Sequence, residues 1–208
     1  MLNKYNSIAV FYPHLSRFIF GKSLINIQLK AIPHLPSRGK ILLIGGGNGE
    51  ILPYIFKERP KLQIEYFEAS SKMIELAKKK VQNNALITFV HSDCLSECST
   101  DVNVVFAPFF FDLFSEADIQ NMLKQLEVRI AKNFTLITAD FQISRKTKLR
   151  QLRKFQIYLS ILFFKLFTNH RLGYLPNISD SIESLSYKAH NTTYLHGNFL
   201  CLQVFTKP

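Results

Sequence analysis

Short apolar runs alternate with amphipathic segments through the middle of the chain. The apolar runs have strand length and are rich in Ile, Val, Leu and Phe, as in strands that are buried on both faces of a sheet. They predict strands at 41–44, 62–68, 85–93, 102–110 and 134–141. The segments between them predict helices at 53–57, 70–81 and 115–131. This alternation predicts an α/β fold, a three-layer αβα Rossmann-like sandwich around a mainly parallel sheet.

The two ends of the chain have different patterns. Residues 3–35 predict a helical lead-in that breaks at Pro13. Near the carboxyl end, residues 186–195 and 199–207 read as strands on either side of His196-Gly197-Asn198, which is typical of a hairpin turn. The sheet is therefore expected to end in an antiparallel hairpin. We expect one domain over 1–208, divided into a helical lead-in or lid (1–38), an α/β core (39–143), a helical insertion or lid (144–185) and the hairpin (186–208).

Positive charge gathers in the helical insertion. The chain of 208 residues has 26 Lys and Arg against 15 Asp and Glu, a net charge of +11, and residues 144–171 hold eight basic residues and no acidic one. Apolar residues recur there at helical spacing, which predicts a helix docked on the sheet with its basic face in water. These residues are Leu149, Leu152, Phe155, Leu159, Leu162, Phe163 and Leu166. A second interpretation makes this basic helix a substrate lid that attracts an acidic molecule or makes a peripheral membrane contact with anionic lipid.

The cysteines, the histidines and the hydropathy of the chain bear on metal binding, membrane insertion and cellular location. Cys94, Cys98 and Cys201 have no metal-ligand spacing, nor do the six histidines, so we expect no metal. The longest apolar run, 157–167, has eleven residues, short of the roughly 20 that a membrane span needs, and the amino terminus lacks a signal-cleavage pattern. We therefore expect a protein of the reducing cytoplasm.

The glycine-rich turn after the first core strand excludes two common nucleotide motifs. A dinucleotide fingerprint that begins at Gly45 requires a third glycine at position 50, where the chain has Glu50. A phosphate-binding P-loop requires Gly-Lys-Ser/Thr at its end, and the chain has Gly49-Glu50-Ile51. An acidic residue at that position would repel phosphate.

Three successive strand ends nevertheless supply groups that suit a nucleoside. Gly45, Gly47 and Gly49 allow close backbone approach, and Glu68 ends the second strand 23 residues after Gly45. A carboxylate at that position can accept hydrogen bonds from both ribose hydroxyls. Asp93, at the end of the third strand, can accept from an adenine amino group or cap a turn. The groups converge where open α/β sheets bind ligands.

Three segments, ILLIGGGNGE, YFEASSKMIELAKK and FVHSDCL, resemble the first motifs of the class I S-adenosylmethionine-dependent methyltransferases, of the type that acts on small molecules. The resemblance covers the chain from Lys40 onward and implies a seven-stranded sheet with S-adenosylmethionine bound by residues 39–143. The lead-in YNSIAVFYPHLSRFIFGKSL is similar to the segment that covers the cofactor in this family, with Tyr5 and Tyr12 near the site. The cofactor-binding residues that it implies are Gly45, Gly46, Gly47, Gly49, Glu68, Ala69, Asp93, Cys94 and Tyr12.

Some positions depart from the family pattern. Leu43 stands where family members carry an acidic residue. The turn GGGNGE also resembles that of aminopropyltransferases, but VFAPFFFDLF lacks their pair of catalytic aspartates. Ala107 and the missing second proline after it argue against methylation of amines in nucleic acids. The aromatic run 109–111 instead favours an apolar or planar substrate.

Asp112, after the fourth strand, and Asp140, at the end of the fifth, are the candidate bases. The sequence therefore predicts methyl transfer by in-line displacement to a small lipophilic or acidic acceptor. Three alternatives stay open: a non-catalytic nucleoside-binding or membrane-associated protein of the same fold, an RNA methyltransferase favoured by the net charge of +11, and an aminopropyltransferase-like enzyme. The oligomeric state is not predicted.

Overall fold

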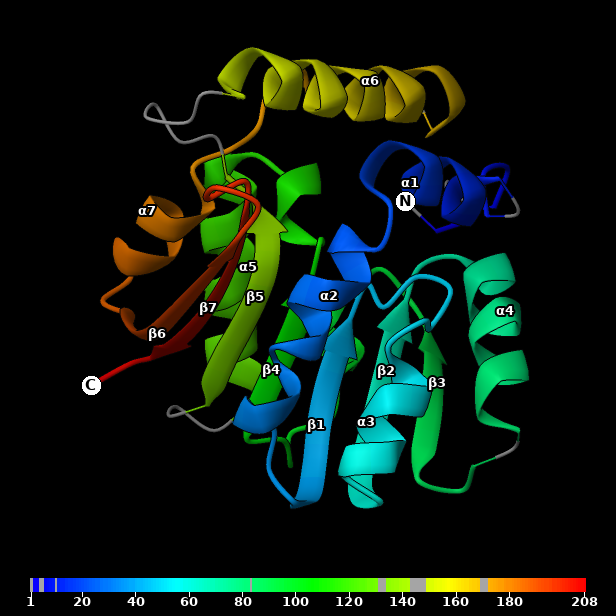
Figure 1. Cartoon of the computed structure of the whole chain (residues 1–208). Coiled ribbons are helices and arrows are strands. Elements are labelled where there is room, and N and C mark those ends of the chain that lie inside the picture. The colour runs from blue at the N-terminus through cyan, green and yellow to red at the C-terminus, as the bar shows by residue number, and fades with distance from the viewer. Residues whose placement is uncertain are drawn as a thin grey trace.

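A computed structural model describes residues 2–3, 6–9, 11–82, 84–130, 134–142, 149–168 and 172–208. Its centre is a seven-stranded sheet with the order β3-β2-β1-β4-β5-β7-β6 (Figure 1). The first five strands run parallel, and β7 lies antiparallel to both β5 and β6. The strands are β1 (Arg38–Ile44), β2 (Lys61–Glu68), β3 (Ile87–His91), β4 (Val104–Pro108), β5 (Thr135–Phe141), β6 (Lys188–Leu195) and β7 (Leu200–Thr206). The predicted α/β fold, with its parallel core and antiparallel end, is confirmed.

Helices cover both faces of the sheet, and one lies across its end (Figure 1). They are α1 (Tyr12–Phe20), α2 (Ser23–Leu29), α3 (Leu52–Glu58), α4 (Ser71–Val81), α5 (Glu116–Arg129), α6 (Arg150–Thr168) and α7 (Ile178–Glu183), with short 3-10 turns η1 (Ile32–His34), η2 (Leu95–Glu97) and η3 (Phe111–Leu113). Among the described residues, no helix combines the length and the hydropathy that crossing a bilayer requires.

The side chains of β1 point alternately to the two faces of the sheet, so this strand contributes to two hydrophobic cores. Ile41 and Leu43 pack with α2, α3 and α4 on one face, and Leu42 and Ile44 pack with α5 and α7 on the other. All four side chains are almost fully buried, because successive residues of a strand point to opposite faces and both faces are covered. The apolar run that predicted this strand therefore serves two cores.

The structure corrects the predicted lead-in. A helix break was expected at Pro13, but Pro13 lies in the first turn of α1, where its missing N–H costs no hydrogen bond. The chain turns instead at Gly21, whose φ of +60° ends α1 before α2 begins. The helix α7 lies inside the predicted helical insertion 144–185, although its own bounds were not predicted. The hairpin turn is confirmed, with positive φ at His196, Gly197 and Asn198.

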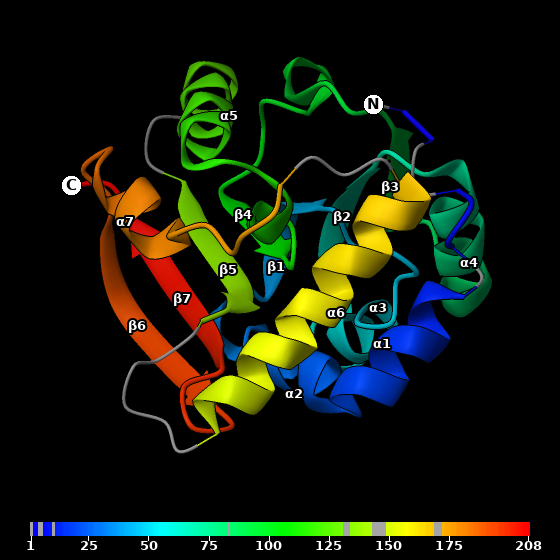
Figure 2. The same ribbon diagram turned by 90° about the horizontal axis from the view of Figure 1, so that it is seen from above.

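The basic helix α6 lies beside α1 across the carboxyl ends of the parallel strands (Figures 1 and 2). The Gln156 side chain donates to the Ile19 carbonyl of α1 at 3.0 Å, which joins the two helices. The predicted orientation of α6 is wrong for four of its seven apolar residues: Leu149, Leu152, Phe155 and Leu162 are exposed instead of docked on the sheet. Leu159 is half-buried, and the side chains of Phe163 and Leu166 lie outside the described residues. The inner side of α6 is built from Ile157, which is buried, together with residues on the same face.

Candidate cofactor and acceptor site

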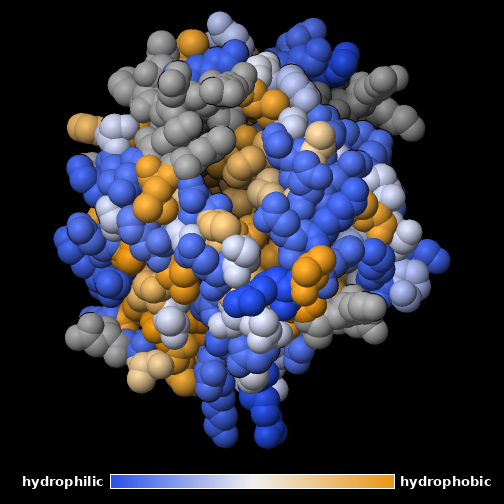
Figure 3. Space-filling model, turned by 180° about the vertical axis from the view of Figure 1, so that it is seen from behind, coloured by the Kyte–Doolittle hydropathy of each residue, from blue (hydrophilic) through white to orange (hydrophobic). Residues whose placement is uncertain are grey.

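A cavity of about 400 Å³ opens at the carboxyl ends of the parallel strands. Its floor comes from the loops after β1, β2, β3 and β4, and its cover comes from the amino-terminal segment, α1 and α2. Figure 3 shows a hollow on the rear face of the molecule with apolar surface inside it. The position is the one where open α/β sheets bind ligands, and the volume lies within the range of small-molecule sites.

The glycine turn forms one wall of the cavity. Gly45 and Gly47 have φ of +66° and +60°, a conformation that favours glycine. A Cβ on Gly46 would lie 2.5 Å from the Tyr66 ring and 2.6 Å from the Leu43 side chain. The Tyr66 hydroxyl donates to the Gly47 carbonyl at 2.7 Å and so fixes the turn from below.

Tyr66 is a site residue that the sequence analysis missed. Its ring is fully buried, and burial raises the pKa of its hydroxyl well above the ordinary value. Leu43, at the position where the family pattern has an acid, is also fully buried and packs beneath Gly46. Apolar packing thus stands at this position, and the Tyr66 hydroxyl supplies a polar contact under the turn.

Glu68 lies at the end of β2 beside the glycine turn. Its Oε2 accepts from the Gly47 N–H at 3.1 Å, and its Oε1 accepts from the Ser70 N–H at 3.0 Å. Burial raises the pKa of the carboxyl, and these two backbone donors oppose that rise. Ser70 also caps α4, because its side chain accepts from the Met73 N–H. Glu68 thus joins the turn after β1 to the start of α4.

The amino-terminal segment is tied to the same strand end. Asn3 donates from its backbone to the Ala69 carbonyl at 2.8 Å, and the Asn6 side chain accepts from the Ser70 hydroxyl at 2.6 Å. Ile8, in the same segment, is buried and lines the cavity. The family resemblance implied Tyr5 and Tyr12 in this cover. Tyr5 and the side chain of Tyr12 lie outside the described residues.

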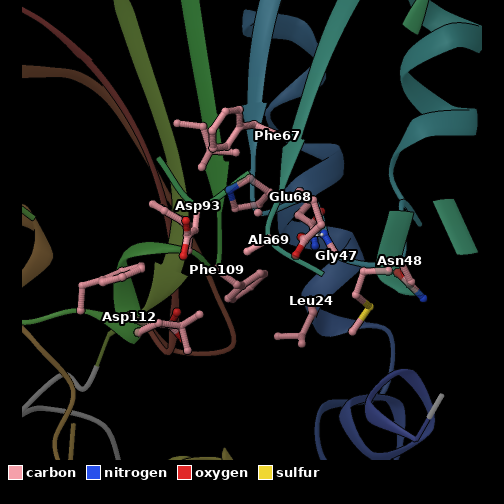
Figure 4. A pocket seen from close by; sticks show the side chains of 18 of the residues that line it. Leu24, Gly47, Asn48, Phe67, Glu68, Ala69, Asp93, Phe109 and Asp112 are labelled. Carbon is pink, nitrogen blue, oxygen red and sulfur yellow. Dashed lines mark hydrogen bonds between the residues drawn. The ribbon is translucent and has the colours of Figure 1, made fainter. Parts of the chain in front are cut away.

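The remaining predicted cofactor residues divide into two groups. Asp93 and Ala69 line the cavity together with Gly45, Gly46, Gly47 and Glu68, and Figure 4 shows Glu68 with Gly47 on one side of it and Asp112 on the other. Gly49 and Cys94 do not line it. A Cβ on Gly49 would lie 2.7 Å from Ala77, so this glycine permits α4 to pack closely.

The opposite wall is aromatic. Phe109 follows β4 with φ of +50°, and its N–H donates to the Ala139 carbonyl at 2.8 Å. Its ring lies 5.1 Å from that of Phe141, and both rings line the cavity. Phe110 contacts the glycine turn, because a Cβ on Gly45 would lie 2.7 Å from its ring. The predicted apolar surface is therefore beside the glycine turn.

Two carboxyl groups meet under this wall. Asp112 lines the cavity, and its Oδ1 is buried without a hydrogen-bond partner among the described residues. Asp140 is buried behind it, also without partners for either carboxyl oxygen. Burial raises the pKa of Asp112 to about 7, and burial together with the neighbouring Asp112 charge raises that of Asp140. Both carboxyl groups are therefore harder to ionise than an exposed aspartate.

Comparison with known proteins agrees with this geometry. Residues 41–133 match the family described as Methyltransferase domain. The matched residues therefore identify 41–133 as a methyltransferase domain. No curated protein sequence matches this chain.

Solved structures extend the likeness of the methyltransferase domain to the whole fold. The pyocyanin biosynthetic protein PhzM has a TM-score of 0.70 and 15% identity, covering 99% of this chain and 62% of PhzM. Mitomycin 7-O-methyltransferase MmcR has a TM-score of 0.69 and 12% identity, covering 99% of this chain and 61% of MmcR. DhpI, solved as a SAM-HEP complex, has a TM-score of 0.67 and 14% identity, covering 96% of this chain and 93% of DhpI. This chain thus spans about three fifths of PhzM and of MmcR.

These likenesses show the fold of the methyltransferase domain. The family uses S-adenosylmethionine, which is the cofactor that the sequence predicted. The family match includes the glycine turn, Glu68, Asp93 and Asp112, and stops before Asp140.

Proposed function

We propose that this chain transfers the methyl group of S-adenosylmethionine to an oxygen or nitrogen atom of a small lipophilic acceptor. One observation carries the proposal: a single cavity has the glycine turn with Glu68 on one wall and an aromatic surface with Asp112 on the other. A methyl donor and an acceptor must lie side by side for an in-line displacement. The printed name of MmcR, a 7-O-methyltransferase, supports oxygen as the accepting atom.

The residues of the glycine turn fit the nucleoside part of the cofactor. A carboxylate can accept about four hydrogen bonds, and the backbone N–H groups of Gly47, Ser70 and Ala69 act on Glu68, so acceptor capacity is left for a ribose hydroxyl. Asp93 lines the same cavity and can accept from an adenine amino group. Gly46 leaves space that a Cβ would fill. When bound, the cofactor supplies an electrophilic methyl group on a sulfonium.

The aromatic wall orients the acceptor and excludes water. Phe109, Phe110 and Phe141 present rings against which an apolar or planar molecule packs. The space beside the glycine turn is open, as an enzyme requires, whereas side chains would fill it in a non-catalytic scaffold. The described lining residues include no pair of aspartates of the kind that aminopropyltransferases carry after the fourth strand, and no Lys or Arg that would bind RNA phosphate.

Asp112 is placed to take the proton that the acceptor loses. Its carboxyl lines the cavity, and its pKa of about 7 makes it a base that is half ionised near neutral pH. Asp140 does not line the cavity and lies behind Asp112, so it acts through the surroundings of that carboxyl. In this assignment Asp112 is the catalytic residue and Asp140 is a positioning residue.

The first experiment measures binding and turnover separately. Calorimetric titration with S-adenosylmethionine and S-adenosylhomocysteine should give micromolar binding. Formation of S-adenosylhomocysteine is then followed with a panel of lipophilic phenols, amines and carboxylic acids. Cofactor binding with turnover on one class supports the proposal. Absence of cofactor binding by the folded protein overturns it, and binding without turnover on any class leaves the non-catalytic alternative as the better one.

A further inference from the structure

The helix α6 departs from the usual amphipathic arrangement, because arginines share its inner side with isoleucines. Arg150 and Arg153 lie on its inner side with buried Nε atoms, and the Arg153 guanidinium lies 4.5 Å from the centre of the Phe199 ring. Ile157 and Ile161 share this side and pack on the core. A helix that rests on a protein and faces water normally turns its apolar side inward and its charges outward. In α6 two arginines point inward.

The outer side of α6 is apolar. Leu152, Phe155 and Tyr158 have exposed fractions of 50%, 55% and 59%, and Leu162 follows one turn later. These residues recur at spacings of three and four, so they form one stripe along the helix. A stripe of this kind in contact with water loses the stabilisation that burial would give.

The helix α1 continues this surface. Its Phe18 is 88% exposed, and Phe11 immediately before it is 69% exposed. Hydrogen bonding between Gln156 and Ile19 holds the two helices together, and Figure 2 shows them side by side over the sheet. Seven of the twelve large hydrophobic side chains that are exposed in the described part of the chain belong to α1, α6 or the residues just before them. We name the outer sides of α1 and α6 the roof surface.

The roof surface is also cationic. Arg17, Lys22, Lys154 and Lys165 are exposed on or next to its helices, and neither helix contains an acidic residue. The sequence shows the same asymmetry: residues 1–49 and 141–179 together have 14 basic residues and no acidic one, while the remainder has 12 basic and 15 acidic residues. Fourteen of the 26 basic residues and none of the acidic ones therefore belong to the two sequence segments that include α1 and α6.

We propose that the roof surface docks on a bilayer of anionic phospholipid. Helices that lie in the membrane interface combine an apolar side of Trp, Phe and Leu with flanking Lys and Arg, and anionic headgroups attract those cations. The roof has both features, and Ser16 of α1 lines the cavity beneath it. Docking places the cavity close to the lipid. This inference goes beyond the proposed function, and its test requires no methyl transfer.

The test is flotation of the full chain with two kinds of vesicle. One kind contains phosphatidylcholine alone, and the other contains phosphatidylcholine with phosphatidylglycerol. We expect binding to the anionic vesicles that weakens at high salt. Lys154→Glu changes two charges at the roof and should lower the partition coefficient about thirtyfold. Phe155→Ser removes an inserting ring and should lower it about tenfold.

Two variants on α5 are matched controls. Lys124→Glu makes the same charge change, and Val128→Ser replaces an 89% exposed apolar residue, both away from the roof. Melting temperatures establish that all variants fold, and each control should bind vesicles as the wild type does. Equal loss in the controls, or no preference for anionic vesicles, overturns the proposal. If the protein does not bind vesicles, two results would assign the roof surface to another partner and overturn the proposal. One is that Phe155→Ser dissociates a dimer, and the other is that Lys154→Glu abolishes binding to an RNA oligonucleotide.

Discussion

Replacing Glu68 by glutamine tests the assignment of the nucleoside site with the smallest change in shape. The carboxylate accepts from Gly47 at 3.1 Å and from Ser70 at 3.0 Å. A glutamine side chain has one acceptor oxygen, so its amide group must face one of these donors and leave a backbone N–H without a partner. It also offers no charge to ribose hydroxyls.

The expected loss follows from these contacts. A hydrogen bond to a charged group contributes about 1.5–3 kcal/mol, so loss of the charged acceptor should weaken cofactor binding by about 2 kcal/mol, or about thirtyfold in Kd. Calorimetric titration with S-adenosylhomocysteine measures this value. The unsatisfied N–H should also lower the free energy of unfolding by about 1–3 kcal/mol, which urea denaturation measures separately.

Glu75→Gln is the matched control. Glu75 is exposed on α4, so this substitution makes the same chemical change away from the cavity. It should leave both quantities unaltered. A folded Glu68→Gln protein that binds the cofactor with the wild-type Kd would refute the ribose assignment.

Three other substitutions test the turn, the cover and the base. Gly46→Ala places a methyl group 2.5 Å from Tyr66 and should cost about 1–3 kcal/mol in urea denaturation; equal stability would contradict the close packing. Asn6→Ala removes the acceptor of the Ser70 hydroxyl and should speed cofactor dissociation several-fold in stopped-flow displacement, a result that an unchanged rate would exclude. Asp112→Asn should abolish the rise of kcat/KM through about pH 7 while Kd for the cofactor stays constant; a persistent rise would assign the base elsewhere.

The pKa of Asp112 also gives the sign of a stability effect. In the folded protein it is raised to about 7, so between the ordinary aspartate value and about pH 7 the folded protein keeps a proton that the unfolded chain has released. Stability from this group therefore falls as pH rises through that window. Relative to wild type, Asp112→Asn should gain stability from pH 5 to pH 8 in urea denaturation, and a constant difference would contradict the raised pKa.

Much of the cofactor half could be predicted because its residues are close in sequence and fixed by local rules. A buried strand followed by glycines, with an acid at the end of the next strand, places Gly45, Gly47 and Glu68 together in any parallel sheet of this order. Contacts between distant segments could not be read in the same way. The hydrogen bond between Asn6 and Ser70 joins positions 64 residues apart, and no periodicity in the sequence marks it.

Gly49 shows a second limit of prediction from sequence, because a glycine at this spacing can serve either ligand contact or close helix packing. Its place in the motif suggested a ligand contact, whereas its missing side chain allows α4 to approach at Ala77. Tyr66 was hidden for a related reason: within an apolar strand its ring looks like core, and only the fold shows its hydroxyl under Gly47. A tyrosine in a buried strand next to a glycine turn is thus a signal worth testing.

The orientation of α6 was predicted wrongly because periodicity locates a stripe and does not say what covers it. Leu152, Phe155 and Leu162 have the spacing of a docked side, and the usual rule places such a side on the protein. The rule assumes that the only competing solvent is water. Arg153 reverses the balance by stacking on Phe199, which gives its guanidinium a partner inside the roof and leaves the apolar stripe outside. When a bilayer covers the outer side of α6, the same rule holds, because the apolar stripe then faces lipid and not water. The vesicle experiment with Phe155→Ser decides whether lipid or water surrounds this stripe.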